Sequence, residues 1–257
     1  MQTKEELLQH KEIDGEMLKA AYDKAAELIT IATDEFTEKF PSSASIHNFY
    51  RPGRNFEWTP GFWTGEVWLA YEKTGDEALK QTAEIEVKDF FRRIKKREGV
   101  NHHDMGFLYC PSCVAAYKLT GSETGKEAAI MAADNLMARF QEKGQFFQAW
   151  GRLGNKNNYR LIIDCLLNMP LLFWAGELTG DKEYEKKAEA HIKTSMKNII
   201  RDDNSTYHTF FFDVKTGEMC IRDRFRGGYG YWCIKIQCRY SEEHPAHPGK
   251  SRLYLQS

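Results

Sequence analysis

The sequence lacks any long apolar run and any strong excess of charge. Its longest apolar stretch, residues 161–175, is interrupted by Asp164, Asn168 and Pro170, so it falls short of the ~20 residues that span a bilayer, and we expect no membrane association. The 36 basic and 37 acidic side chains give a net charge of −1. So small a net charge creates no long-range field that attracts phosphates, which argues against a nucleic-acid partner. The charged segment 1–16 contains no apolar signal core, and we expect a cytoplasmic protein.

Cysteine is also scarce. Six cysteines among 257 residues do not form a dense disulfide framework. Cys110 and Cys113 make a C-x-x-C pair inside an apolar run, where buried small side chains are a better interpretation than a redox pair. The chain is 42% hydrophobic, which is enough to build a folded core.

A short pattern occurs three times, in residues 70–76, 116–122 and 175–181. In each, an apolar helical run ends in Thr-Gly and is followed by Asp or Ser. A glycine in the left-handed conformation closes a helix, and Asp or Ser caps the next one. The pattern therefore predicts helical hairpins, with helix stops at Gly75, Gly121 and Gly180 and helix starts at Asp76, Ser122 and Asp181.

The two helices of each hairpin differ in character. The helix before Thr-Gly is apolar on nearly all sides, whereas the helix after it, at 77–97, 123–143 or 182–200, is amphipathic. We expect inner and outer helices respectively, and hence an all-α toroid or solenoid. One more helix is expected at 15–40, and extended structure only near 206–214, where aromatic residues and threonine favour it.

Asp104 and Asp164 occupy equivalent places in successive hairpins. Asp104 precedes Thr120 by sixteen residues, and Asp164 precedes Thr179 by fifteen. This register predicts that both carboxylates lie at one rim of the inner helices and face one cleft. Asp164 stands in an apolar run, where an ionised carboxylate is costly to bury, so it is expected to be paired, hydrogen-bonded or protonated. A helix cap is the alternative role for either aspartate alone.

Aromatic and histidine residues surround this register. Trp58 and Trp150 lie in loops, where their rings offer stacking surfaces for a sugar, whereas Trp63 and Trp68 lie in a helix and are expected in the core. The run 102–104, His-His-Asp, contains metal-ligating residue types. Consecutive side chains seldom converge on one ion, however, and no third ligand stands at helical spacing. We expect neither a metal nor another cofactor.

Five short motifs follow one another between residues 40 and 217. They are WTPGFWTG (58–65), HHDMGF (102–107), QAWG (148–151), IIDCLLNMPLL (162–172) and STYHTF (205–210). Together they resemble the unsaturated glucuronyl hydrolases, glycoside hydrolase family 88. The resemblance implies an (α/α)6 toroid that hydrolyses oligosaccharides with a 4,5-unsaturated uronic acid at the non-reducing end, by hydrating the C4–C5 double bond.

The resemblance also implies roles for individual residues. Asp164 corresponds to the general acid/base that protonates C4 and activates the water attacking C5, and Asp104 corresponds to the second essential carboxylate. The apolar Ile162, Ile163 and Leu166 would raise the pKa of Asp164. The implied partner is an unsaturated uronate oligosaccharide, bound by a protein that is a monomer at full length. Five further residues are implied to line the sugar subsite: Trp58, Phe62, His103, Trp150 and His208.

Two other functions remain open. The unsaturated rhamnogalacturonyl hydrolases share this fold and chemistry on pectin fragments, although the joint presence of the 102–104 and 162–168 motifs favours the first reading. A helical-repeat interaction module without chemistry is the alternative of a different class.

The resemblance stops after Glu218. The family continues with His-Gln-Gly and Arg-Gly-Gln-x-Trp segments that this sequence lacks, and residues 219–224, MCIRDR, resemble a translated sequencing adaptor. Six hairpins of this size require roughly 300 residues, so residues 1–218 are expected to form a partial catalytic domain of about four hairpins. Residues 219–257 are expected to be a disordered, non-homologous tail. We expect a chain of low stability with weak or absent activity.

Overall fold

The computed structural model describes residues 13–201 and 205–222. The chain divides into one unit that ends at Arg224 and a second unit over residues 225–257. The second unit, and with it most of the expected tail, lies outside the described residues.

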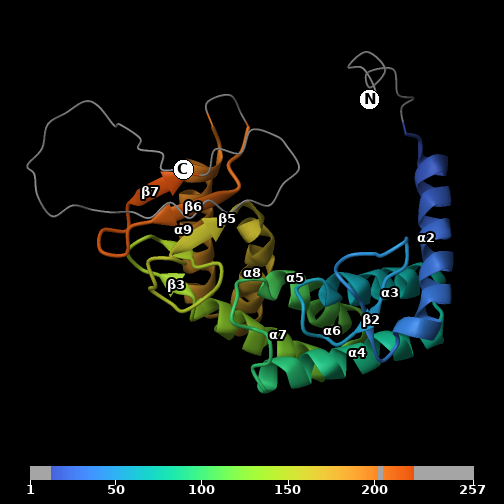
Figure 1. The fold of residues 1–257 in the computed structure, drawn as a ribbon. Helices are drawn as coiled ribbons and strands as arrows, with labels where there is room; N and C mark the ends of the chain where they lie inside the picture. The colour runs from blue at the N-terminus through green and yellow to red at the C-terminus, as the bar shows by residue number, and fades with distance from the viewer. Residues whose placement is uncertain (1–12, 202–204, 223–257) are drawn as a thin grey trace, which may run out of the picture. The chain divides into compact units, whose positions relative to one another are not determined.

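Helices dominate the described part, as the sequence predicts (Figure 1). A π-helical turn, η1, joins α5 to α6, and a 3-10 turn, η2, precedes α8. Pro111, which has no amide hydrogen, lies in η1, so the inner helix expected there is irregular. The elements are α2 (Gly15–Phe36), α3 (Pro60–Thr74), α4 (Glu77–Lys95), α5 (Met105–Tyr109), η1 (Cys110–Val114), α6 (Ala115–Thr120), α7 (Glu123–Met137), η2 (Ile163–Asn168), α8 (Met169–Thr179) and α9 (Lys182–Ile199).

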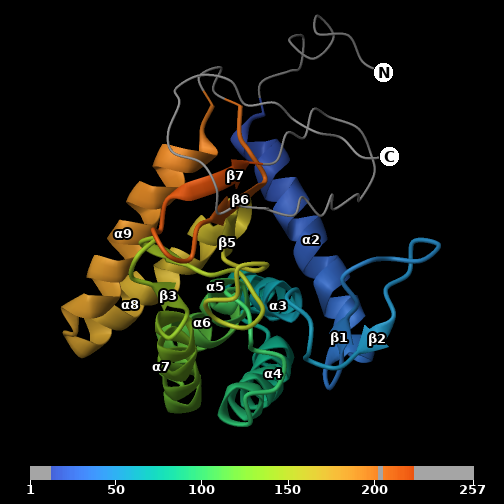
Figure 2. The same cartoon turned by 60° about the vertical axis from the view of Figure 1, so that its left-hand side comes forward.

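The three predicted hairpins are confirmed. Gly75, Gly121 and Gly180 close α3, α6 and α8 with φ of 70°, 73° and 79°. The next helix starts each time at a capping side chain, that of Asp76, Ser122 or Asp181, which accepts a hydrogen bond from a backbone N–H of the first turn. Helices α3 and α4, α6 and α7, and α8 and α9 pack as pairs, and α2 packs beside α3 (Figures 1 and 2).

Strands are short but more widespread than expected. Strand β6 (Thr209–Phe212) confirms the extended segment near 206–214. It pairs antiparallel with β5 (Arg160–Ile162) and with β7 (Met219–Arg222). Strand β5 was not expected, and the first residues of the expected tail belong to this sheet. Two more antiparallel pairs were not predicted: β1 (Phe40–Pro41) with β2 (Pro52–Gly53), and β3 (Phe140–Gln141) with β4 (Phe146–Phe147).

The main core lies between the paired helices and contains Trp63 and Trp68, as predicted. A smaller core beside β5 and β6 includes Phe146 and Phe210. Cys110 and Cys113 are free thiols, and burial raises the pKa of each to about 12, so the structure supports their reading as packing residues. Among the helices in the described ranges, none is long and apolar enough to cross a membrane.

Candidate functional site

The two aspartates converge on one imidazole. The Nε2 atom of His103 lies 3.0 Å from Oδ1 of Asp104 and 3.6 Å from Oδ1 of Asp164. The side chain of His103 is 2% exposed, that of Asp104 15% and that of Asp164 40%. Asp104 directly precedes α5 but its side chain makes no cap bond, and Asp164 lies within η2. The predicted meeting of two carboxylates from successive hairpins is therefore present, and the helix-cap alternative does not hold.

Close backbone packing brings the two segments together. A Cβ atom on Gly106 would lie 2.3 Å from Cα of Asn168, so only glycine lets the start of α5 approach η2 so closely. The Oδ1 atom of Asn168 accepts a hydrogen bond from the Gly106 amide at 2.8 Å. Asn168 was not among the predicted site residues. Its partner is a backbone amide of another hairpin, so the contact has no residue-type signal in the sequence.

The surroundings of Asp104 favour its ionised form. Burial acts to raise the pKa of this carboxyl, but hydrogen bonds from His102 and His103 outweigh burial and hold the pKa well below its usual range. The Nδ1 atom of His102 lies 3.0 Å from Oδ2 of Asp104. Asp104 is therefore a fixed negative charge at neutral pH.

The surroundings of Asp164 favour its protonated form. Burial raises the pKa of Asp164, the charge of Asp104 raises it further, and His103 acts in the opposite direction. The direction agrees with prediction, but part of the reason given for it is wrong. Ile163 and Leu166 are each 37% exposed, because η2 turns them outward, and only Ile162 is buried. The pair is thus one ionised and one protonatable carboxyl, the division of roles expected of a general acid next to a fixed charge.

The same three residues have a spacing that suits a cation. Ligand atoms of His103, Asp104 and Asp164 lie within 4.8 Å of one another. The local spacing of residues 102–104 predicts no third ligand. The third residue of this cluster, Asp164, comes from the next hairpin. The His103 contact with Asp104 also satisfies the geometry of an ion pair or hydrogen bond, whereas Oδ1 of Asp164 is buried without a hydrogen-bond partner among the described residues.

Two predicted aromatic residues form one side of the site. The rings of Trp58 and Phe62 lie 6.2 Å apart and meet edge to face, and both contact Phe107 in the first turns of α5. Trp58 is about half exposed. The cluster therefore places an accessible indole one helical turn from Asp104.

Trp150 and His208 flank the carboxylates elsewhere. Trp150 forms an isolated β-bridge with His102, and the guanidinium of Arg160 lies 4.1 Å from the centre of its indole. The carbonyl of His208 accepts a hydrogen bond from the amide of Ile163 at 2.9 Å. His208 is also close enough to Asp164 to lower the pKa of that carboxyl. The structure thus brings His103 and His208 into electrostatic contact with Asp164, links Trp150 to His102, and joins Trp58 and Phe62 to Phe107, three residues after Asp104.

A buried arginine that sequence reasoning missed holds the Trp58 loop. Arg93, on outer helix α4, is fully buried. It donates to the Oδ1 atom of Asn55 at 2.7 Å and to the carbonyls of Phe56 and Glu57 at 2.9 Å each. It also donates to the carbonyl of Gly99 at 2.8 Å. One side chain therefore ties the loop before Trp58 to the segment that leads into 102–104.

A second buried arginine holds the Trp150 loop. Arg139, just after α7, donates to the carbonyl of Gln148 at 2.8 Å and to that of Gly151 at 3.3 Å. It also donates to the Oδ1 atom of Asn101 at 2.7 Å. Burial lowers the pKa of Arg139 to about 10. The guanidinium groups of Arg93 and Arg139 therefore both hold the segment 99–103, because each donates hydrogen bonds to oxygen atoms of that segment.

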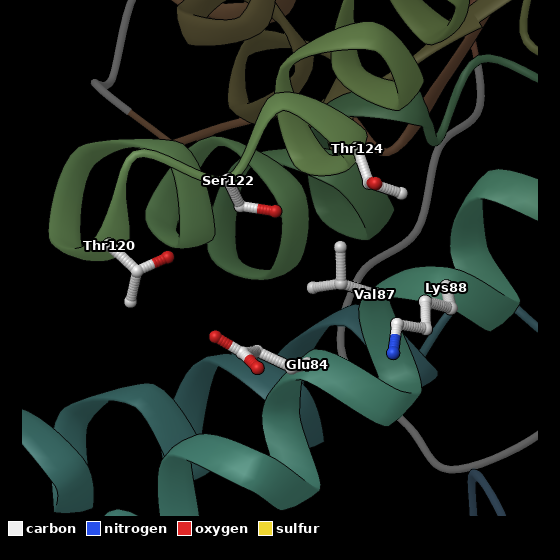
Figure 3. Close-up of a pocket in the computed structure, with 6 residues that line it drawn as sticks. All are labelled: Glu84, Val87, Lys88, Thr120, Ser122 and Thr124. Carbon is white, nitrogen blue, oxygen red and sulfur yellow. The ribbon is translucent and has the colours of Figure 1, made fainter.

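A separate hollow of about 220 Å³ lies between α4 and the α6–α7 turn. Figure 3 shows Glu84 and Val87 of α4 facing residues of that turn. Neither Asp104 nor Asp164 lines it, and its lining contains no aromatic ring. The hollow is lined by Glu84, Val87, Lys88, Thr120, Ser122 and Thr124.

Comparison with known proteins identifies the family of this chain. The profile of Glycosyl Hydrolase Family 88 matches residues 28–219. The unsaturated chondroitin disaccharide hydrolase of Streptococcus agalactiae serotype III (strain NEM316) is 51% identical over 209 residues, which are 81% of this chain and 52% of that protein. The unsaturated glucuronyl hydrolase of Bacillus sp. (strain GL1) is 44% identical over 195 residues, 76% of this chain and 50% of that protein.

Solved structures show the same relation. The crystal structure of unsaturated glucuronyl hydrolase from Streptococcus agalactiae matches with a TM-score of 0.81 and 48% identity, over 84% of this chain and 54% of that one. A mutant of that enzyme complexed with dGlcA-GalNAc6S matches with a TM-score of 0.70 and 41% identity, over 87% of this chain and 54% of that one. The chain spans about half the length of the curated relatives it matches.

Proposed function

Because this chain belongs to Glycosyl Hydrolase Family 88, we propose that Asp104 and Asp164 hydrate the C4–C5 double bond of a 4,5-unsaturated uronic acid at the non-reducing end of an oligosaccharide. One observation carries the proposal. The two carboxyls meet at His103, and their surroundings move their pKa values in opposite directions. A site that must first donate a proton and then accept one needs such a pair.

The reaction begins at Asp164. Its carboxyl gives a proton to C4, and positive charge develops at C5 next to the ring oxygen. Water then attacks C5 and returns a proton to the Asp164 carboxylate, so one water is added and the acid is restored. The resulting hemiketal opens and releases the neighbouring sugar. Since no displacement occurs at the anomeric carbon, the rule that links carboxylate separation to inversion or retention does not apply.

Asp104 supplies the fixed negative charge. It lies close enough to Asp164 to favour protonation of that residue, which primes the acid. Its oxygens also accept hydrogen bonds from sugar hydroxyls in this scheme, and its negative charge stabilises the cation forming at C5. Asp104 thus acts on the transition state as well as on its neighbour.

The substrate class follows from the aromatic and cationic neighbours. Trp58 and Trp150 offer partly exposed indole faces, and His208 and Arg160 provide positive or hydrogen-bonding character suited to a uronate. Relatives named for unsaturated chondroitin disaccharides and a neighbour complexed with dGlcA-GalNAc6S support glycosaminoglycan fragments rather than pectin fragments.

The test is the loss of ultraviolet absorbance when the conjugated double bond is hydrated. We expect this chain to bind an unsaturated chondroitin disaccharide and to consume it at most slowly, because it spans about half the length of its relatives. Asp164→Asn should abolish turnover while binding, measured by calorimetry, persists. Asp181→Asn is a matched control, because asparagine caps α9 as well as aspartate does. Absence of both turnover and binding in the unaltered chain, or turnover retained in Asp164→Asn, refutes the proposal.

A further inference from the structure

Two buried imidazole nitrogens near the aspartate pair stand out. Neither Nδ1 of His103 nor Nε2 of His191 has a hydrogen-bond partner among the described residues. Both side chains are almost completely buried, and His191 belongs to outer helix α9. A buried polar atom without a partner costs roughly 1–3 kcal/mol, so two of them in one region call for a shared explanation.

The hydrogen-bond network assigns the tautomer of His191. The amide of Phe147 donates to its Nδ1 atom at 3.0 Å, so Nδ1 is an acceptor. Burial lowers the pKa of His191 to about 3, and the ring is neutral at pH 7. A neutral ring with an acceptor at Nδ1 has its proton on Nε2. The unpartnered atom of His191 is therefore a donor.

The unpartnered atom of His103 is of the opposite kind. Its Nε2 faces Oδ1 of Asp104 at 3.0 Å, and Asp104 is ionised, so Nε2 donates to that carboxylate. In the neutral ring Nδ1 is then an acceptor. The donor of His191 and the acceptor of His103 match.

The two rings also flank the same short segment of chain. The amide of His103 donates to the carbonyl of Ala149 at 2.7 Å, and His191 binds the amide of Phe147 two residues earlier. Positive charge on His103 would lower the pKa of His191, which shows that the rings are within electrostatic reach of each other. A buried water needs two to four polar partners, and these two nitrogens supply a donor and an acceptor.

We propose that His191 is a positioning residue of the carboxylate site, whose Nε2–H, through one buried water, holds His103 as the neutral Nε2–H tautomer. With an imidazolium at His103 the water would accept from both N–H groups, and neither nitrogen would accept a hydrogen bond from the water in return. His103 therefore donates to Asp104 and does not take the proton that Asp164 needs. The charged and titratable groups that face His103 are Asp104, Asp164 and His191. Only the kinetic part of this inference rests on the proposed function.

Nitrogen-15 NMR of the histidine rings tests the proposal in the unaltered chain at pH 7. The His103 signals, assigned by their loss in His103→Gln, should show a protonated Nε2 and an unprotonated Nδ1. A protonated Nδ1, whether in the other tautomer or in the imidazolium, overturns the proposal without any variant of His191.

Two substitutions then separate the two bonds of His191. In His191→Asn the amide lies near the former Nδ1 position, so it serves Phe147 but does not reach His103. In His191→Gln the amide nitrogen reaches the former Nε2 position. We expect the His103 tautomer to be lost in the first variant and kept in the second. His47→Asn is the matched control, because His47 is exposed and asparagine tolerates its φ of 52°.

Kinetics give a separate readout. Turnover in His191→Asn should fall about tenfold below that in His191→Gln, a size typical of residues that orient a functional histidine, with little change in KM. Equal tautomers and equal rates in the two variants overturn the proposal. An unaltered chain without turnover contradicts the proposed function instead, and leaves the NMR result to decide the role of His191.

Discussion

The Nε2 atom of His103 lies 3.0 Å from Oδ1 of Asp104, and this contact favours the ionised form of Asp104 over that of Asp164. The imidazole and its neighbour His102 stabilise the negative charge of Asp104. Asp104 in turn makes a second negative charge unfavourable at Asp164. The protonation of Asp164, the acid of the proposed mechanism, therefore depends on the neighbouring pair of His103 and Asp104.

Replacing Asp104 with asparagine should lower the pKa of Asp164, because the substitution removes a neighbouring negative charge. Carboxyl carbon-13 NMR with labelled aspartate measures this directly, without need of turnover. Where turnover is measurable, the loss of rate at high pH should move to lower pH, since Asp164 acts first as an acid. Asp181→Asn is the control and should leave the titration unmoved. An unchanged or higher pKa at Asp164 in Asp104→Asn contradicts this account.

Much of the fold follows from local chemistry in the sequence. Each Thr-Gly-Asp or Thr-Gly-Ser element contains both the stop of one helix and the cap of the next, and all three act as predicted. The strands escaped prediction because β1–β4 are two residues long and show no alternation. Strand β5 escaped because its apolar residues also fit a buried helix, and only its pairing with β6 distinguishes the two.

The part of the site that depends on the matching hairpin positions of the two aspartates was predictable from the sequence. The part that depends on buried polar residues was not. The matching positions of Asp104 and Asp164 were sufficient to place them together. Arg93 and His191 lie on amphipathic outer helices, where a polar residue is normally solvent-facing. Their partners are mostly backbone groups of distant loops, which have no residue-type signature in the sequence.

Glu86 should make the folded state less stable as pH rises. Burial raises its pKa from 4.5 to about 8, and the carboxyl accepts a hydrogen bond from the Trp63 indole at 2.7 Å. A raised carboxyl pKa means that stability is full below about pH 4.5 and is lost as pH rises toward about 8. Near pH 8 the cost is about 4 kcal/mol.

Glu86→Gln should remove this dependence, because the amide oxygen keeps the bond to Trp63 but does not ionise. Urea unfolding at pH 5 and pH 8 measures the change. The difference between the two pH values should shrink in Glu86→Gln and persist in Glu72→Gln, whose side chain is exposed. An equal difference in both variants would show that Glu86 is ionised in the folded protein.

Arg93→Lys should destabilise the chain by about 2 kcal/mol or more, although the charge is kept. Lysine has three donors on one atom and cannot satisfy the carbonyls of Phe56 and Gly99 together with Asn55. Arg92→Lys is the adjacent control, since Arg92 makes partly exposed ion pairs with Asp89 and Glu98. Its effect should stay within about 0.5 kcal/mol. Denaturant unfolding of both variants decides, and equal losses would rule out a clamping role for Arg93.

Trp150→Ala should weaken binding of an unsaturated disaccharide about fivefold with little loss of stability. The guanidinium of Arg160 covers one face of the indole at 4.1 Å, and the ring is more than a third exposed, which leaves surface on which a sugar stacks. A stacking contact contributes about 1 kcal/mol, which corresponds to this change in Kd. Calorimetry on Trp150→Ala measures it. Phe49→Ala, at another exposed aromatic residue, controls for loss of surface aromatic area. If both variants bind as the unaltered chain does, Trp150 does not stack on the sugar, and the aspartates must orient the substrate without this side of the site.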